Sequence, residues 1–190
     1  MIENVGLNPG RSGLYRVLDE MGAAIDLQDR REIGGEPVAD LQVRHAPLRG
    51  VTIDPAIVPS MIDEFPALFV AAAFATGTTI TSGLDELRVK ESDRLGTMAQ
   101  ALRAIGARAG EHADGLAIEG SGGRPLAGGG PIEVRHDHRI AMSMAIAACA
   151  SEAGIEVDDT SCIATSFPGF AALLDRATGE PPPSPSGTTS

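Results

Sequence analysis

Hydrophobic and polar residues follow helical spacing in several stretches of the chain, and each stretch predicts a helix. Residues 59–75 and 137–151 are alanine-rich and apolar nearly all round, which is typical of helices that are buried on every side. The other predicted helices have a single apolar face each. They span residues 14–22 with Ser12 as a cap, 92–106, and 167–177.

Between these helices lie short β-branched or alternating segments that predict strands. Residues 107–119 predict a hairpin that turns at Asp114-Gly115, and a glycine-rich loop follows at 120–130. Residues 180–190 are mostly Pro, Ser, Thr and Gly and predict a disordered tail. The remaining strand candidates are residues 1–6, 25–27, 38–43, 48–53, 78–81, 132–134 and 155–157.

The ends of three predicted helices resemble one another: Met21-Gly22-Ala23, Ile105-Gly106-Ala107 and Ala177-Thr178-Gly179. Between them, a buried alanine-rich helix, a short β-branched strand and a loop occur twice, which indicates an internal repeat. We therefore predict an α/β domain of repeated units, residues 1–179, with buried alanine-rich helices packed on sheets. The starts of the buried helices and the loop before the central helix are expected to converge on one face.

Composition narrows the class of protein. The 190 residues are 43% hydrophobic but only 3% aromatic, so Ala, Leu, Ile, Val and Met must form the core. The net charge of −11 argues against a nucleic-acid surface, and no apolar run is long enough to span a bilayer. Cys149 and Cys162 are too few for a disulfide framework and lack metal-ligand spacing, so we expect a cytoplasmic protein without a metal.

One charged stretch, residues 87–95, is locally basic although the chain as a whole is acidic. Ser92 is a suitable N-cap for the following helix, which places Arg94 in the first turn and Lys90 and Glu91 in the loop before it. Free backbone N–H groups and the positive helix end would then face the same place as the two cations, an arrangement that suits a phosphate or carboxylate. The negative charge of Glu91 weakens anion binding, so its presence among the cations indicates a role in proton transfer. The alternative is a solvated, salt-bridged helix start.

Asp137-His138-Arg139 opens the second alanine-rich helix. An arginine in a first turn opposes the helix dipole, which is unfavourable unless an anion binds there. Arg94 and Arg139 are therefore candidates for a clamp on a carboxylate or phosphate. The alternative for Arg139 is an intrahelical ion pair with Asp137 or Glu133.

Asp63 lies in the first turn of the first alanine-rich helix. The helix start and nearby cations would keep its carboxylate ionised, so that it could accept a proton or orient a hydroxyl group. The alternative role for Asp63 is helix capping. His138 fits a supporting position better than that of a general base.

Residues 87–95 and Asp137-His138-Arg139-Ile140-Ala141-Met142 together resemble EPSP synthase, the 3-phosphoshikimate 1-carboxyvinyltransferase family. The resemblance continues in order through residues 8–23, 60–66 and 163–168, and its details are similar to the class II, glyphosate-tolerant bacterial branch. It implies an enolpyruvyl-transferase-type domain of repeated βαβαββ-like units. It also implies that residues 1–179 are part of the second of two domains, as in a truncated or split gene product.

The resemblance implies transfer of an enolpyruvyl group from phosphoenolpyruvate to the 5-hydroxyl of shikimate 3-phosphate, by addition and then elimination of phosphate, without a cofactor. By position, Asp63 would be the proton acceptor that also holds the shikimate hydroxyls, and Lys90 would contact shikimate 3-phosphate. Glu91 would transfer protons at the phosphoenolpyruvate methylene. Arg94 and Arg139 would bind phosphoenolpyruvate.

Two positions depart from the family pattern: Thr165 stands where many members have lysine, and Glu86 stands where some have asparagine. Because the other domain supplies further contacts, we expect little or no turnover by this chain alone and a separate first domain as its partner. One alternative is the sister transferase that acts on UDP-N-acetylglucosamine, which relies on a loop cysteine that neither Cys149 nor Cys162 matches. The other is a non-enzymatic fragment that serves as a binding or assembly module.

Overall fold

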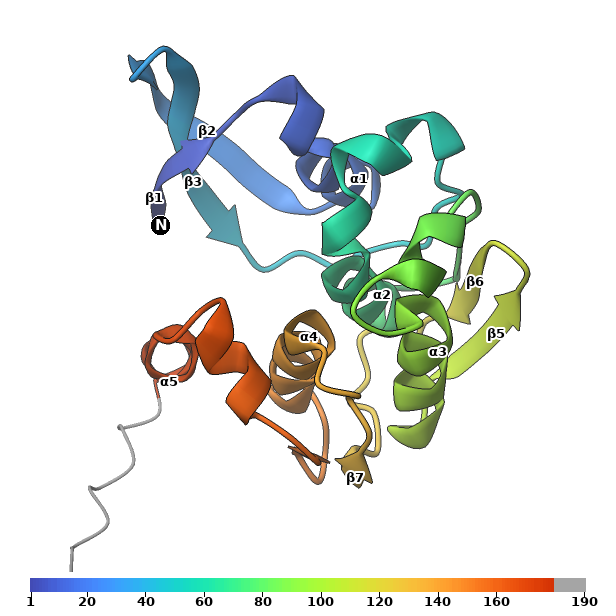
Figure 1. Ribbon diagram of the computed structural model, residues 1–190. Coiled ribbons are helices and arrows are strands. Elements are labelled where there is room, and N and C mark those ends of the chain that lie inside the picture. The colour runs from blue at the N-terminus through green and yellow to red at the C-terminus, as the bar shows by residue number, and fades with distance from the viewer. Residues whose placement is uncertain (180–190) are drawn as a thin grey trace, which may run out of the picture.

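The computed structural model describes residues 1–179 and shows sheets arranged around a central group of helices (Figure 1). Helices α2 (Phe65–Phe74), α3 (Arg94–Ala104) and α4 (His138–Ala148) contact one another in the centre. Helices α1 (Gly13–Glu20) and α5 (Phe170–Thr178) lie outside them. The strands are β1 (Ile2–Gly6), β2 (Ala24–Ile33), β3 (Glu36–Arg44), β4 (Thr78–Ile80), β5 (Arg108–His112), β6 (Gly115–Glu119), β7 (Gly129–Ile132) and β8 (Ile155–Val157).

The predicted internal repeat is confirmed by the topology of the sheets. The first sheet has the order β1-β3-β2 and the second has the equivalent order β4-β6-β5, and both are antiparallel. Helices α1 and α3, which precede the equivalent hairpins, both end at a glycine with positive φ, 94° at Gly22 and 95° at Gly106. After each glycine, the next backbone N–H donates to an equivalent carbonyl at 2.9 Å. The third unit contains β7, α4, β8 and α5, with β7 and β8 paired in parallel.

Helix α2 is buried as its sequence predicts. Seven of its residues are buried, and they lie on all sides of the helix: Phe65, Pro66, Leu68, Phe69, Val70, Ala72 and Ala73. Small alanine side chains allow α3 and α4 to approach α2 closely, and methionines and leucines of the neighbours fill the remaining space. No helix within residues 1–179 is both long and apolar enough to cross a membrane.

The glycine-rich loop after β6 caps the C-terminal end of α2. Four successive backbone N–H groups, from residues 120 to 123, donate to carbonyls of residues 73–77 at 2.8–2.9 Å. The carbonyls of Ala73 and Phe74 belong to the last turn of α2 and have no partners within the helix, so the loop satisfies them. The carbonyls of Ala75 and Gly77 follow the end of the helix. A Cβ atom on Gly120 would lie 2.0 Å from the backbone oxygen of Ala75, so only glycine fits this position.

Gly120→Ala is therefore expected to lower the free energy of unfolding by about 3 kcal/mol, the upper end of the usual cost of overpacking. The cost is high because the clashing atom belongs to a backbone carbonyl that cannot rotate away. Urea denaturation followed by far-ultraviolet circular dichroism measures this loss. Gly6→Ala is the matched control, because a Cβ there meets nothing within 4 Å. Equal stability of the two variants would show that the loop does not pack against α2 in this way.

Several element boundaries differ from the prediction. Two short 3₁₀ helices, Pro55–Ser60 and Ile62–Glu64, replace the expected first turns of α2, because Pro59 and the non-helical backbone at Met61 (φ −154°, ψ 22°) interrupt a continuous helix. Ser60, which could cap a helix that begins at Pro59, does not do so: its Oγ donates to the carbonyl of Ile57 at 2.7 Å. Ser12 precedes α1, but its side chain makes no capping bond.

The strand boundaries differ as well. The segment 48–53 forms only isolated bridges, at residues 49 and 52, rather than the predicted strand. Strands β2 and β3 extend through polar residues up to the Gly34-Gly35 turn, because cross-strand hydrogen bonding does not depend on apolar side chains. Strand β7 ends at Ile132, where the predicted strand begins, and α5 begins at Phe170 instead of residue 167. The predicted tail, residues 180–190, lies outside the described residues.

Candidate active site

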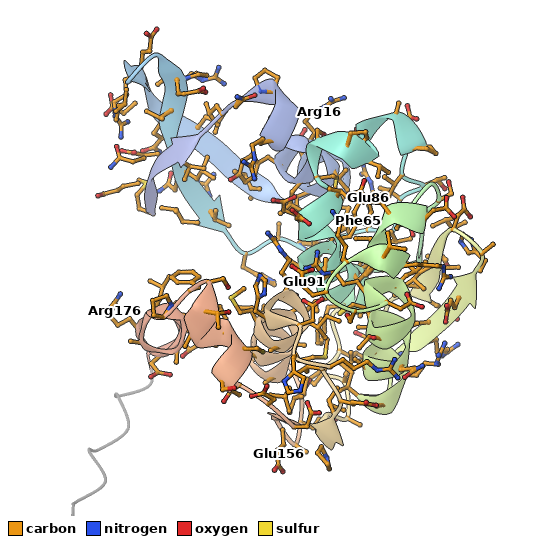
Figure 2. The ribbon with its side chains drawn as sticks, viewed as in Figure 1. Arg16, Phe65, Glu86, Glu91, Glu156 and Arg176 are labelled. Atoms are coloured by element: carbon orange, nitrogen blue, oxygen red, sulfur yellow. The ribbon has the colours of Figure 1, made fainter. Side chains whose placement is uncertain are left out.

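The N-terminal ends of α2, α3 and α4 meet in one place, as the sequence predicts. Asp63 lies in the 3₁₀ helix that leads into α2, and it contacts the loop before α3 through Lys90 Nζ at 3.8 Å. It also contacts Arg94 Nη1 of α3 at 3.1 Å and Arg139 Nη2 of α4 at 3.6 Å. Figure 2 shows Glu91 in the middle of the molecule, near these helix ends, whereas Arg16, Glu156 and Arg176 lie at its margin.

Arg94 is the buried centre of this cluster. Its side chain is only 1% exposed, yet it contacts three carboxylates: Asp137 through Nε at 2.7 Å, Asp63 through Nη1, and Glu91 through Nη2. Burial alone would lower the pKa of Arg94, but the hydrogen bond and charge of Asp137, together with the other two carboxylates, outweigh burial and raise it. Arg94 therefore stays cationic in the core.

Arg139 reaches across to the start of α2 instead of pairing within its own helix. Its Nη1 donates to the backbone oxygen of Asp63 at 3.0 Å, so the two arginines approach the same residue. The alternative of an intrahelical ion pair is wrong. From Arg139, Asp137 accepts the backbone N–H, at 3.0 Å, but no side-chain N–H. Glu133 contacts Arg135 at 3.5 Å. The carboxylate of Asp137 is buried and forms its ion pair with Arg94 instead.

Lys90 is held by Glu86, one of the two positions that depart from the family pattern. The Glu86 carboxylate accepts a hydrogen bond from Lys90 Nζ one helical turn away. This hydrogen bond is the largest cause of the raised pKa of Lys90, and the charge of Asp63 adds to it. The Lys90 ammonium therefore lies between two carboxylates of its own chain.

The caps of the two central helices differ from the prediction in one case. Asp93, not Ser92, caps α3, and its Oδ1 accepts the N–H of Gly96 at 3.0 Å. Ser92 Oγ instead donates to Oδ2 of Asp137 at 3.1 Å. Asp137 caps α4 and is fully buried. The capping role can be inferred from an Asp before an alanine-rich helix, but nothing local indicates that its second oxygen meets Arg94.

His138 and its neighbour His136 take different positions. His138 is half-buried in the first turn of α4, and its side chain forms no hydrogen bond with any residue in the described part of the chain. Its supporting role therefore stays a prediction. Exposed His136 contacts Asp159 at 2.7 Å, and hydrogen bonds from Ser161 and then His136 lower the pKa of Asp159. The sequence pattern does not predict this pair, because its two residues are 23 positions apart.

The cluster opens on one side of the molecule. Asp63 and Arg139 are each 33% exposed and Glu91 is 50% exposed, so their polar groups face outward from the helix ends. A hollow of about 210 Å³ adjoins Asp63 and Arg139. Its other walls are mainly apolar, with Met142, Ile146 and Phe170 among them. Within residues 1–179, no group of three or more His, Cys, Asp or Glu side chains is arranged to hold a metal ion.

The two cysteines differ in environment. Cys149 is exposed after α4, whereas Cys162 is buried in the 3₁₀ helix Ser161–Thr165, where burial raises the pKa of its thiol. Neither lies in a glycine-rich loop, as the loop cysteine of the sister transferase would. The thiol arrangement therefore does not favour that alternative.

We expect Cys149 to react with Ellman's reagent at least about ten times faster than Cys162 at pH 8, because the thiolate is the reacting form and burial disfavours it. The colour change should occur in two phases of one thiol each, and unfolding in guanidinium should merge them. Cys149→Ser should remove the fast phase only. Loss of the slow phase instead would contradict the assigned burial.

The class of this domain is therefore an α/β domain of repeated units in which two arginines, a lysine and several acids gather where three helix N-termini meet. Residues 1–174 match the model of the family EPSP synthase (3-phosphoshikimate 1-carboxyvinyltransferase), and the chain belongs to this family. The prediction made from the motifs is confirmed.

Curated relatives with the name 3-phosphoshikimate 1-carboxyvinyltransferase agree with this assignment. That of Sphingopyxis alaskensis is 65% identical over 173 residues, covering 91% of this chain and 39% of that protein. That of Novosphingobium aromaticivorans is 60% identical over 181 residues, covering 94% and 41% respectively. The chain therefore spans about two fifths of the length of these relatives.

Solved structures confirm the fold. EPSP synthase from Acinetobacter baumannii is similar with a TM-score of 0.88 and 45% identity, over 91% of this chain and 40% of that one. The enolpyruvyl transferase NikO from Streptomyces tendae has a TM-score of 0.56 at 20% identity, over 87% and 34% respectively, which shows a shared fold alone. The predicted enolpyruvyl-transferase-type α/β fold is thus confirmed.

Proposed function

We propose that this chain is part of the second domain of a 3-phosphoshikimate 1-carboxyvinyltransferase and supplies one side of its active site. The observation that carries the proposal is the convergence of Asp63, Lys90, Glu91, Arg94 and Arg139, from three segments of the chain, at the meeting point of three helix N-termini. Family membership supports it, because relatives at 60–65% identity carry this name. The substrates would be phosphoenolpyruvate and shikimate 3-phosphate.

In the addition step, the 5-hydroxyl oxygen of shikimate 3-phosphate bonds to C2 of phosphoenolpyruvate. The hydroxyl proton passes to Asp63, and Glu91 gives a proton to the methylene carbon, C3, which becomes a methyl group. In the elimination step, C3 returns a proton to Glu91, the double bond reforms, and the C2–O bond breaks as phosphate leaves with the proton that Asp63 held. Asp63 suits proton acceptance because it is a partly exposed carboxylate beside the buried Arg94. Glu91, which is 50% exposed, can carry the proton for C3 once a substrate anion replaces it as the partner of Arg94.

The arginines bind phosphoenolpyruvate by replacing their carboxylate partners in the chain with anionic groups of the ligand. Arg94 and Arg139 now donate to acids of their own chain, Glu91 and Asp63. A ligand carboxylate or phosphate can replace these acids as the bidentate partner of a guanidinium group. The exchange would release Glu91 from Arg94 in the presence of substrate, when the acid is needed for proton transfer.

The charge balance of the cluster supports the expectation of little turnover by this chain alone. Three cations, Lys90, Arg94 and Arg139, face four carboxylates: Asp63, Glu86, Glu91 and Asp137. Two substrates that carry phosphate and carboxylate groups require an excess of positive charge. The missing cations would come from a complementary first domain, which we propose as the partner of this chain.

The test is release of phosphate from phosphoenolpyruvate in the presence of shikimate 3-phosphate. It would be measured with this chain alone and after mixing with the separately produced first domain of the Sphingopyxis alaskensis relative. We expect activity only after mixing, and its loss with Arg139→Ala. Arg108→Ala is the matched control, because Arg108 forms an exposed ion pair with Glu119 elsewhere. A folded chain without activity in either case would overturn the proposal and favour a binding or assembly module.

A further inference from the structure

The carboxylate of Asp137 joins the starts of α3 and α4. Its side chain is 0% exposed and accepts four hydrogen bonds. Oδ1 accepts the backbone N–H groups of Arg139 at 3.0 Å and Ile140 at 3.4 Å, which caps α4. Oδ2 accepts Nε of Arg94 at 2.7 Å and Oγ of Ser92 at 3.1 Å. Each oxygen therefore serves a different helix.

The Oδ2 bond determines how the Arg94 guanidinium is oriented. A guanidinium group is planar, and its five N–H donors have fixed directions. With Nε bonded to Asp137, the N–H groups of Nη1 and Nη2 are left to reach Asp63 and Glu91. These are the two acids at the open side of the cluster. The buried carboxylate thus directs the outer edge of Arg94 toward the place where a ligand anion would bind.

The hydrogen bonds to Oδ1 fix the position of the Arg139 backbone. Because Arg139 is the second residue of α4, its backbone N–H is held by the same carboxylate that orients Arg94. The two arginines are therefore both held by hydrogen bonds to the same buried carboxylate, although they lie on different helices. A shift of Asp137 would change their separation and angle together.

We propose that Asp137 is a positioning residue that sets the mutual orientation of Arg94 and Arg139 for binding of phosphoenolpyruvate. The proposal rests on the proposed function for its ligand, but the orientation of Arg94 is a property of the chain itself. The competing explanation is purely structural: Asp137 only caps α4 and neutralises a buried cation. The two explanations predict different consequences for Asp137→Asn.

Asparagine separates the two roles of Asp137. An asparagine side chain caps a helix about as well as aspartate does, so its oxygen can still accept the N–H groups of Arg139 and Ile140. Its amide group then replaces Oδ2 and presents N–H donors to Nε of Arg94, where no hydrogen bond can form. Asp137→Asn should therefore leave the α4 cap intact and release the Arg94 guanidinium. Asp93→Asn is the matched control, because Asp93 caps α3 and contacts Arg88 instead of Arg94.

The first readout is hydrogen exchange at the Arg94 Nε–H, followed by ¹⁵N nuclear magnetic resonance on the full chain and assigned with Arg94→Lys. We expect Asp137→Asn to speed this exchange at least about tenfold, and Asp93→Asn to leave it unchanged. The second readout is steady-state kinetics after mixing with the first domain. Here Asp137→Asn should raise the KM for phosphoenolpyruvate by about 10- to 100-fold and leave that for shikimate 3-phosphate within about twofold.

The outcomes distinguish the positioning role from the proposed function. If Asp137→Asn and Asp93→Asn have the same Arg94 exchange rate and the same ratio of the two KM values, Asp137 is structural only and the proposal is overturned. If the unmodified mixture does not turn over phosphoenolpyruvate, the proposed function fails. The exchange readout then decides the orientation of Arg94 on its own, because it requires no substrate.

Discussion

Arg94→Met is expected to lower the free energy of unfolding by about 3–5 kcal/mol, because it removes one partner of a buried ion pair. Methionine is apolar and flexible enough to fill the space of the arginine stem. It leaves the carboxylate of Asp137, which is 0% exposed, without a cation. The remaining hydrogen bonds from Ser92 and the start of α4 reduce the loss of stability, but they cannot neutralise the charge of Asp137.

Urea denaturation of the single and double variants measures this effect. The double variant Arg94→Met/Asp137→Asn should regain much of the lost stability, because the uncompensated charge disappears and the cap on α4 remains. Arg108→Met is the control: its ion pair with Glu119 is exposed, so its loss should cost less than about 1 kcal/mol. A cost for Arg94→Met no greater than that of the control would contradict the assignment of Arg94 as the charge-bearing centre of the core.

Glu91→Gln is expected to lower the kcat of the mixed domains by about 10²- to 10⁴-fold, the usual contribution of a general acid–base residue. Glutamine keeps an oxygen that can accept the hydrogen bond from Arg94 Nη2, so the fold and the cluster geometry should persist. The substitution also removes a negative charge beside Arg94. The KM for phosphoenolpyruvate should therefore stay the same or fall, because the ligand no longer competes with a carboxylate.

Phosphate-release kinetics over a range of phosphoenolpyruvate concentrations separates the two effects. Glu119→Gln is the matched control, since Glu119 is a partly exposed glutamate that also accepts a hydrogen bond from an arginine. It should leave both constants unchanged. A raised KM with normal kcat for Glu91→Gln would mean that Glu91 only supports binding, and its proton-transfer role would be wrong.

The elements that the sequence predicts correctly are those whose pattern is local. The apolar body of α2, the hairpin of β5 and β6 and the glycines after α1 and α3 depend on contacts within a few residues. The hairpin turns one residue earlier than predicted, at Ala113-Asp114 instead of Asp114-Gly115. The predicted helix boundaries are wrong where two neighbouring residues are both suitable caps. Ser92 and Asp93 are both good caps, and the choice between them follows from Asp137, which accepts the Ser92 hydroxyl.

The residues of the candidate site could be selected from the sequence, since charged groups before helix starts stand out from an acidic, alanine-rich background. Which of these residues pair with one another could not be predicted from the sequence. Arg94 and Asp137 are 43 residues apart, and Arg139 and Asp63 are 76 apart. No periodicity relates such distant positions, and a guanidinium group has several carboxylates within reach in the folded chain.

The sequence by itself therefore determined the class of fold, the repeat and the family, because apolar spacing, turn glycines and long motifs are properties of contiguous residues. Only the tertiary structure decided that Arg94 is buried, that Arg139 turns to Asp63, and that Asp137 joins both helices. The physical reason is that the packing of α2, α3 and α4 brings three helix starts together. Burial then selects the one arrangement in which the cation in the core is fully paired.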